Sequence, residues 1–198
     1  MNETLRAFLA IDLPASLQST LTEITGQLRH QNLQSIRPAN PNSLHLTLKF
    51  MDNVPANKIP EIVKAVSGII QLTTSFDLKI GPIVIFPNER FPRTISVGFK
   101  GNLSPIIDMH RRVETNMACL GIIKEQRPFI PHITLARMRG DASSNVCRSA
   151  IRLANQYWTG SDFDFQVNSV SLIKSILSSN GAIYDAIANF ETKDMNRI

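Results

Sequence analysis

The chain contains one short pattern twice, as LHLTLKF at residues 44–50 and as PHITLAR at residues 131–137. In both copies a histidine, an aliphatic residue, a threonine and a leucine follow one another. Residues i and i+2 of a β-strand point to the same face of a sheet. The histidine and the threonine of each copy are therefore predicted to share one face, while the leucine and isoleucine side chains face a core. The repetition predicts two equivalent strands that face each other and share one ligand.

A longer repeat surrounds these two copies. His45 and His132 are 132 − 45 = 87 positions apart, and the same spacing, 163 − 76 = 87, relates the first phenylalanines of SFDLKI at residues 75–80 and DFDFQV at residues 162–167. Each motif is followed by a polar turn, a helical stretch and then one of these segments. Solenoid repeats are about 20–50 residues long, so this period instead predicts two lobes of similar build, with the motif strands at a pseudo-twofold axis.

The pattern of apolar residues predicts alternating strands and helices. Turn lengths and hairpins favour an antiparallel α+β fold over a doubly wound sheet, and no linker divides residues 1–198, so we expect a single bilobal domain. Residues 31–42 are predicted to be a connector, residues 51–55 a turn, and residues 178–181 an Asn-Gly hairpin turn. The predicted helices are residues 15–30, 59–70, 103–119 and a stretch through 146–154; the predicted strands are residues 5–12, 44–50, 76–86, 94–99, 131–137, 163–176 and 182–190.

Composition and charge limit the classes of protein to which the chain can belong. Its 198 residues are 43% hydrophobic, and no apolar run approaches the roughly 18 residues that a membrane span requires. The N-terminus leads directly into a predicted strand without a basic leader or a cleavage site, so we expect a cytoplasmic protein. Cys119 and Cys147 are accordingly expected to be reduced thiols. The net charge of +5 favours anionic partners, including nucleic acid.

Two histidines and two threonines form a set that suits phosphoryl transfer without a metal. Imidazole has an unperturbed pKa near neutrality, so one histidine can be neutral while the other is protonated. One of His45 and His132 would remove a proton from the attacking oxygen, and the other would protonate the leaving oxygen. Each such role typically contributes about 10²–10⁴ in rate. Thr47 and Thr134 would donate hydrogen bonds to non-bridging phosphate oxygens, and Arg137 would neutralise their charge.

Other kinds of chemistry find less support in the sequence. Zinc usually takes three or four protein ligands, but two of the four histidines lie on predicted helices and neither motif carries a third ligand at close spacing. Neither cysteine lies near a motif. The glycine patterns that bind nucleoside triphosphates and dinucleotides do not occur. We therefore expect neither a metal nor a cofactor.

Three arginines outside the motifs are candidate RNA contacts. Arg90 and Arg93 lie in a proline-rich loop, and Arg127 precedes the second motif. The loop is either a solvated turn or an arm that faces nucleic acid. A further basic group, from His110 to Arg112, is predicted to be a solvated helix face.

The motifs and their surroundings resemble a known family. Paired His-x-Thr motifs are typical of the 2H phosphoesterase superfamily, and the chain looks like its bacterial RNA 2′,3′-cyclic phosphodiesterases, also called 2′–5′ RNA ligases. The likeness extends over almost the whole chain. Besides both motifs it includes RAFLAIDLP at residues 6–14, FPN at residues 86–88 and the closing segment at residues 175–184.

This resemblance implies two pseudo-symmetric lobes, with antiparallel sheets flanked by helices, around a basic central cleft. It implies a monomeric enzyme without cofactors that opens 2′,3′-cyclic phosphates at RNA ends, those of tRNA fragments included, to leave a 2′-phosphate. By position, His45 and His132 match the catalytic pair, with His45 favoured as the general acid and His132 as the base. Thr47 and Thr134 match the phosphate-binding threonines, and Arg137 matches the motif arginine.

Two departures from the family pattern bear on substrate preference. The family often has an aromatic residue where Arg37 or Ser96 stands in this chain, and residues 51–52, Met-Asp, replace a common apolar-glycine pair. These changes leave the catalytic residues intact but affect base stacking. The alternatives are a small cyclic-nucleotide phosphodiesterase and a non-catalytic RNA- or nucleotide-binding module, and the catalytic residues also permit RNA ligation by the reverse reaction.

Overall fold

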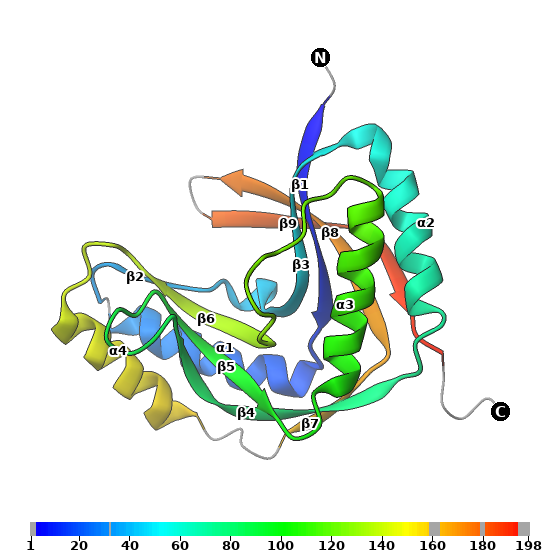
Figure 1. Cartoon of the computed structure of the whole chain (residues 1–198). Helices are drawn as coiled ribbons and strands as arrows, with labels where there is room; N and C mark the ends of the chain where they lie inside the picture. Colours follow the sequence, from blue (N-terminus) through cyan, green and yellow to red (C-terminus); the bar gives the residue numbers. More distant parts are fainter. Residues whose placement is uncertain (1–2, 32, 159–162, 179–180, 194–198) are drawn as a thin grey trace.

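The computed structural model describes residues 3–31, 33–158, 163–178 and 181–193. Within these residues a nine-stranded antiparallel sheet is combined with four α-helices, so the predicted α+β fold is confirmed (Figure 1). The helices are α1 (Ala15–His30), α2 (Ile59–Ile70), α3 (Ser104–Cys119) and α4 (Ser144–Tyr157). The strands are β1 (Thr4–Asp12), β2 (Ile36–Pro38), β3 (His45–Pro55), β4 (Phe76–Phe86), β5 (Thr94–Lys100), β6 (His132–Met138), β7 (Asp164–Val167), β8 (Ser169–Ser178) and β9 (Gly181–Glu191).

The strand order shows that two similar halves are joined into one sheet. The strands run β7-β4-β5-β6-β3-β1-β8-β9, and β2 pairs with β6. The motif strands β3 and β6 are neighbours at the centre, where Leu46 pairs with Ile133, 133 − 46 = 87 positions later. Two residues related by the repeat lie opposite each other only at the symmetry axis. The predicted pseudo-twofold axis therefore passes between the motif strands, and the two lobes share a single sheet.

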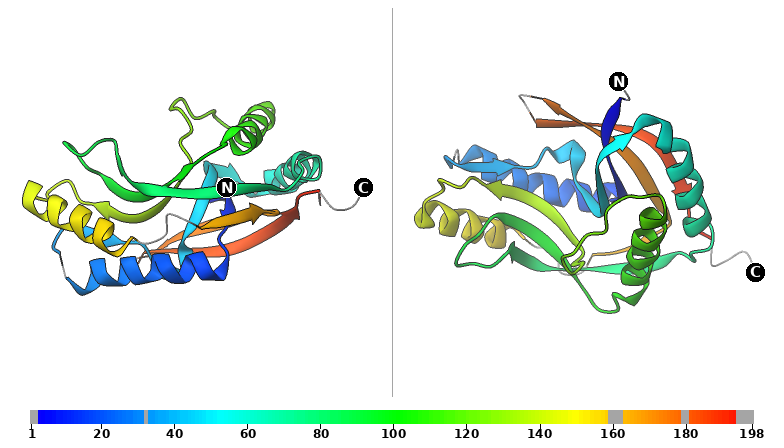
Figure 2. Two further views of the ribbon diagram at one scale, coloured as in Figure 1. Left: turned by 90° about the horizontal axis from the view of Figure 1, so that it is seen from below. Right: turned by 45° about the horizontal axis from the view of Figure 1, so that its top comes forward.

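The pseudo-twofold axis also relates the two segments that contain the Phe-Asp pair, which are the start of β4 and the segment that leads into β7. β4 pairs antiparallel with β7, so that Asp77 lies opposite Gln166 and Lys79 lies opposite Asp164. A shift of 87 positions exchanges these two pairs, since 77 + 87 = 164 and 166 − 87 = 79. Through Asn168, β7 continues into β8 of the other half, and the sheet curls (Figure 2).

Each half of the sheet is covered by one helix from each copy of the repeat. α1 and α4 pack together and contact β2, while α1 also contacts β6 (Figure 1). α2 and α3 pack together in the other half, where α3 contacts β3 and α2 contacts β8 and β9. Apolar residues such as Leu17, Leu21 and Ile24 of α1 and Ile62 and Val66 of α2 are buried in the continuous core beneath the helices. We call the opposite side of the sheet the inner face.

The structure corrects three local predictions. β3 continues through residues 51–55, predicted to be a turn, because Met51 and Val54 are buried and this part of the strand pairs with β1. The predicted connector contains β2, which pairs with β6. The single strand predicted for residues 163–176 is divided at Asn168, because its two parts pair with different strands. The hairpin of β8 and β9 is present, and residues 179–180 of its turn lie outside the described residues.

Two further observations concern the predicted class of protein. Among the described ranges, no helix has the length and apolar character that a membrane crossing requires. Cys119 is exposed and Cys147 is buried, and both are free thiols.

Candidate active site

The two motif strands place their polar residues on the inner face, as the alternation predicts. His45 and Thr47 are partly exposed, whereas the leucines between and beside them are buried; His132 and Thr134 repeat the pattern on β6. The pairing of Leu46 with Ile133 sets the register of the two strands. By that antiparallel register His45 lies next to Thr134, and Thr47 lies next to His132. The structure therefore brings the four predicted motif residues together.

Each motif strand contains one extra residue, and this changes the face that the following side chains occupy. Two consecutive residues of β1 pair with Thr47 and Lys49, so Leu48 forms a β-bulge. Leu135, 135 − 48 = 87 positions later, is skipped in the same way between β5 and β6. A bulge breaks the strict alternation of side chains along a strand. The residues after the two bulges are therefore displaced from the faces that simple alternation predicts.

The bulge at Leu135 explains how Arg137 reaches the site. An odd number of positions separates Arg137 from Thr134, so strict alternation would turn its side chain toward the core. Ala136 takes the buried position instead, and Arg137 is exposed. Its positive charge acts on His45, in the direction that lowers the pKa of that imidazole. The predicted motif arginine thus belongs electrostatically to the same site.

After the bulge at Leu48, the position equivalent to Arg137 is occupied by an aromatic residue. Phe50 lies 137 − 50 = 87 positions before Arg137, and its side chain is 54% exposed. Its ring packs beside Phe8, with centroids 5.5 Å apart. An exposed aromatic ring is a surface on which a nucleobase can stack. The sequence reasoning missed this residue because the bulge is invisible in the hydrophobic pattern.

Both imidazoles are held by the same backbone contact. His45 Nδ1 lies 2.7 Å from the Ser43 carbonyl oxygen, and His132 Nδ1 lies 2.8 Å from that of Ile130. A carbonyl oxygen only accepts hydrogen bonds, so Nδ1 is the donor in each case. This fixes the Nδ1–H tautomer in the neutral ring and leaves Nε2 as the atom that takes or gives a proton.

Aromatic rings pack against both imidazoles. Phe8 stacks on His45 at a centroid distance of 4.7 Å and an angle of 25°, and Tyr184 meets the same imidazole edge-on at 5.5 Å. Phe86 packs on His132 at 4.7 Å. These aromatic contacts restrict the orientations of the rings. The three residues lie in segments 6–14, 86–88 and 175–184, the segments that carry the family resemblance beyond the motifs.

A short chain of hydrogen bonds reaches the neighbourhood of His45. Asp12 lies opposite His45 in the pairing of β1 with β3. Ser171 Oγ donates to Asp12 Oδ2 at 2.6 Å, and Asn189 Nδ2 donates to Ser171 Oγ at 3.1 Å. Burial lowers the pKa of His45 below its usual value of 6.5, while the Ser43 carbonyl and the Asp12 carboxylate partly oppose this. The neutral imidazole is therefore favoured in the free protein.

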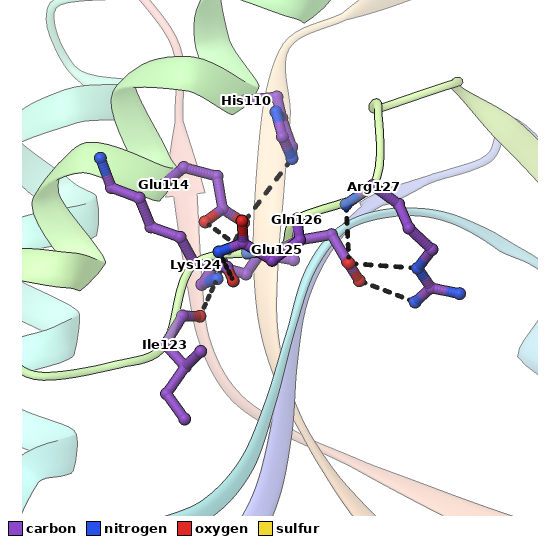
Figure 3. Close-up of polar contacts among 8 residues, drawn as sticks. His110, Glu114, Ile123, Lys124, Glu125, Gln126 and Arg127 are labelled. Atoms are coloured by element: carbon purple, nitrogen blue, oxygen red, sulfur yellow. Dashed lines mark hydrogen bonds and ion pairs between the residues drawn. The ribbon is translucent and has the colours of Figure 1, made fainter.

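The three candidate RNA-binding arginines differ in their surroundings. Arg90 and Arg93 are exposed in the loop after Phe86, and the Arg90 guanidinium lies 5.3 Å from the centre of the Phe91 ring. Arg127 instead makes two hydrogen bonds to Glu125, of 3.1 Å from Nε and 2.7 Å from Nη2 (Figure 3). These contacts lower the pKa of the Glu125 carboxyl to about 2. The charge of Arg127 is thus neutralised locally, whereas the loop arginines face solvent.

The positions that depart from the family pattern differ from each other. Ser96 lies opposite Thr134 and is fully buried, and its Oγ has no hydrogen-bond partner within the described part of the chain. Arg37 is exposed on β2, opposite Arg137.

In the portion of the chain that the structure describes, no group of three or more metal-ligating side chains is found.

A buried ion pair supports the loop that leads to His132. Lys49 Nζ lies 2.8 Å from Glu114 Oε1, and the two side chains are only 2% and 10% exposed. Lys49 also donates to the Ile123 carbonyl at 3.0 Å, and the Glu125 amide donates to Glu114 Oε2 at 3.2 Å. Figure 3 shows Glu114 of α3 beside this loop. The pair thereby joins β3, α3 and the loop of residues 123–125.

His110 belongs to this cluster, so the prediction of a solvated helix face is wrong for this residue. Its Nε2 lies 3.7 Å from Glu114 Oε1, and its ring stacks on Phe129 with centroids 4.0 Å apart. Burial lowers the pKa of His110, and the charge of Glu114 opposes the effect. Arg111, by contrast, is exposed and pairs with Asp108. The sequence pattern missed the difference because Phe129 comes from a loop distant in the chain.

Comparison with known proteins identifies the family. The family model described as LigT like phosphoesterase matches residues 11–96 and 101–184. The chain belongs to this family. It is therefore a phosphoesterase, which confirms the prediction of an enzyme related to the 2H phosphoesterases.

Individual relatives of this LigT-like chain agree with that result. A Methanocaldococcus jannaschii protein named RNA 2′,3′-cyclic phosphodiesterase is 27% identical over 191 residues, which are 92% of this chain and 98% of the relative. A protein of the same name from Escherichia coli is 31% identical over 146 residues, 74% of this chain and 77% of that protein.

Solved structures show the same fold. A Thermus thermophilus protein superposes with a TM-score of 0.77 at 22% identity, covering 96% of this chain and 100% of the other. Escherichia coli LigT complexed with 3′-AMP superposes with a TM-score of 0.75 at 24% identity, covering 96% and 99%.

We predict that Glu114→Ala lowers the free energy of unfolding by about 3–5 kcal/mol, because it leaves the Lys49 ammonium buried without its partner. Urea denaturation measures the change. The double variant Lys49→Met, Glu114→Leu removes both charges and is expected to recover most of the loss. A single variant as stable as the wild type would show that the pair does not hold this part of the fold together.

Proposed function

We propose that the chain hydrolyses 2′,3′-cyclic phosphates at RNA ends to 2′-phosphates, with His45 and His132 as the acid–base pair. The observation that carries this proposal is the arrangement of the two imidazoles. Each Nδ1 is held by a backbone carbonyl two residues earlier, and each ring projects from the inner face beside a threonine. The relatives named RNA 2′,3′-cyclic phosphodiesterase support the choice of substrate. Escherichia coli LigT, which has the same fold, forms a complex with the nucleotide 3′-AMP.

The reaction needs two proton transfers on opposite sides of one phosphorus atom. Nε2 of His132 takes a proton from water as the oxygen attacks phosphorus, and the bond from phosphorus to the ribose 3′-oxygen breaks. Nε2 of His45 gives its proton to that 3′-oxygen, and the 2′-phosphate remains. Thr47 and Thr134 donate hydrogen bonds to the non-bridging oxygens, and the guanidinium of Arg137 stabilises the charge that develops there.

The roles of the two histidines agree with the electrostatics once substrate is considered. The pKa of His45 is lowered in the free protein, which by itself opposes a role as acid. A bound phosphodiester brings a negative charge next to the imidazole, and a nearby opposite charge favours the protonated form. We assign His45 as the acid in the complex, where the substrate supplies the charge that keeps it protonated.

The same residues permit ligation. If an RNA 5′-hydroxyl replaces water as the attacking group, the bond to the 3′-oxygen breaks in the same way and a 2′–5′ linkage forms. Hydrolysis dominates in dilute RNA because water is in large excess.

The first test is hydrolysis of an oligoribonucleotide with a 2′,3′-cyclic phosphate end in the presence of EDTA. Because the imidazoles supply both proton transfers, we expect turnover without added metal. His45→Ala and His132→Ala should each lower the rate about 10²–10⁴-fold. His30→Ala, which changes an exposed histidine at the end of α1, is the control. Activity that survives both active-site substitutions would overturn the mechanism.

The pH dependence tests the assignment of His45. For the wild type we expect kcat/KM to fall with rising pH at a pKa below 6.5, and kcat to fall at a higher pH, because the first reports the free enzyme and the second the complex. Asp12→Asn removes a charge that raises the pKa of His45, so its kcat/KM should fall at still lower pH. Glu23→Gln, an exposed change on α1, is the control. An Asp12→Asn profile that matches the wild type would contradict the assignment.

Salt dependence tests the loop arginines. In single-stranded nucleic acid each neutralised phosphate contributes about 0.7 to the slope of log affinity against log salt. The double variant Arg90→Ala, Arg93→Ala should therefore reduce the slope by about 1.4 when RNA binding is measured by fluorescence anisotropy. Arg127→Ala should leave it nearly unchanged, since Glu125 already neutralises Arg127. A slope that changes only in Arg127→Ala would reverse the assignment of these contacts.

A further inference from the structure

A pocket lies where β7, β8 and β9 meet the segment before β4. Its volume is about 330 Å³, which is within the range of pockets that bind small ligands. Its lining is almost entirely polar and contains no lysine or arginine. The groups available for hydrogen bonding are the amides of Gln166, Asn168 and Asn189, the hydroxyls of Ser75 and Ser169 and the carboxylate of Glu191.

One of these groups is buried without a partner. Ser75 is 5% exposed, and its Oγ has no hydrogen-bond partner within the described ranges. A buried hydroxyl that makes no hydrogen bond is costly. Because Ser75 lines the pocket, a polar ligand in the pocket would satisfy it.

The pocket continues the active site along the inner face. Asn189 pairs with Ser171, Ser171 with Ala10, and Ala10 with Thr47. Residues directly opposite each other in a sheet share a face, so the pocket wall and Thr47 belong to one row of side chains. The row crosses four strands, which corresponds to about 14 Å along the sheet at ~4.8 Å per strand. The hydrogen bonds from Asn189 through Ser171 to Asp12 follow the same direction.

The chemistry of the lining selects a nucleobase over a phosphate. A phosphate group would find no cation in the pocket and would be repelled by Glu191. Asn and Gln amides form paired hydrogen bonds with base edges, and a carboxylate accepts from the exocyclic amino groups of bases. At about 14 Å from Thr47, the pocket is too far away for the base of the nucleotide that carries the cyclic phosphate. A base farther along the strand can reach it.

We propose that this pocket is a subsite for an amino-bearing base, upstream of the terminal nucleotide of the RNA substrate. The inference rests on the proposed function, because it takes the strand to be anchored by its cyclic phosphate between His45 and His132. Glu191 accepts a hydrogen bond from the amino group, and Asn189 and Gln166 bind the rest of the base edge. Adenine, cytosine and guanine each carry an exocyclic amino group, whereas the exocyclic groups of the uracil ring are both carbonyl oxygens.

The test compares trinucleotides that end in uridine 2′,3′-cyclic phosphate and differ only in the two upstream bases. Uridine 2′,3′-cyclic phosphate alone is the reference without a neighbour. In the wild type we expect kcat/KM to be higher for amino-bearing neighbours than for uridine, by about fivefold to 100-fold. Glu191→Gln offers an N–H donor in place of one acceptor oxygen, so it should abolish or reverse this ranking while leaving turnover of the mononucleotide unchanged. Asp185→Asn makes the same change at an exposed position of β9 outside the pocket and should behave as the wild type does.

The ranking of bases is the readout, because removing a negative charge can raise RNA affinity in general. A wild type without any ranking, or a Glu191→Gln variant that keeps the wild-type ranking, would overturn the subsite. If the wild type does not hydrolyse the mononucleotide either, the proposed function fails. The pocket can then be tested separately by fluorescence anisotropy with trinucleotides that end in a 3′-phosphate. Tighter binding of amino-bearing bases that disappears in Glu191→Gln would support the pocket. Equal binding of all bases would exclude it.

Discussion

The candidate active site depends on the register between two strands. Leu46 pairs with Ile133 at the symmetry axis, and this contact places two imidazoles and two hydroxyls on one face. Side chains alternate along a strand, so if either strand slipped by one residue, its histidine and threonine would turn toward the core and its buried aliphatic residue would come to the inner face. The buried leucines and isoleucine therefore hold the register through the cost of exposing them. The bulges at Leu48 and Leu135 then reset the alternation, and Arg137 returns to the face where the phosphate is expected.

Symmetry of the framework does not make the two halves of the site alike. His45 is stacked on Phe8 and lies opposite Asp12, whereas His132 packs against Phe86 and lies opposite Gly98. Acid–base catalysis by two identical groups requires that their surroundings differ, so that one is protonated while the other is not. The positions after the bulges differ as well, since one carries the cation Arg137 and the other the exposed ring of Phe50. The site thus has a cationic side on β6 and an aromatic side on β3.

Local pattern was sufficient to predict α1 and α2 within their observed bounds, the two motif strands and the shared face of His45, Thr47, His132 and Thr134. The period of 87 also predicted the symmetry axis. What escaped prediction depends on partners that are distant in the chain. β2 is a strand only because β6 lies beside it, and His110 is half-buried because the ring of Phe129 covers it. The bulges escaped because one extra residue leaves the hydrophobic pattern unchanged.

The exchange of elements between the two halves has a consequence for how the chain folds. The first repeat supplies β4 to the half of the sheet that contains β5 and β6, and α1 to its cover, while the second supplies β8 and α3 in return. The first repeat alone therefore cannot bury its own apolar surface as it leaves the ribosome. Contacts between residues far apart in sequence slow folding, and exposed strand edges favour association with other chains. Each half of the sheet is therefore complete only when both repeats have been synthesised, because each half contains strands and a helix from the other repeat.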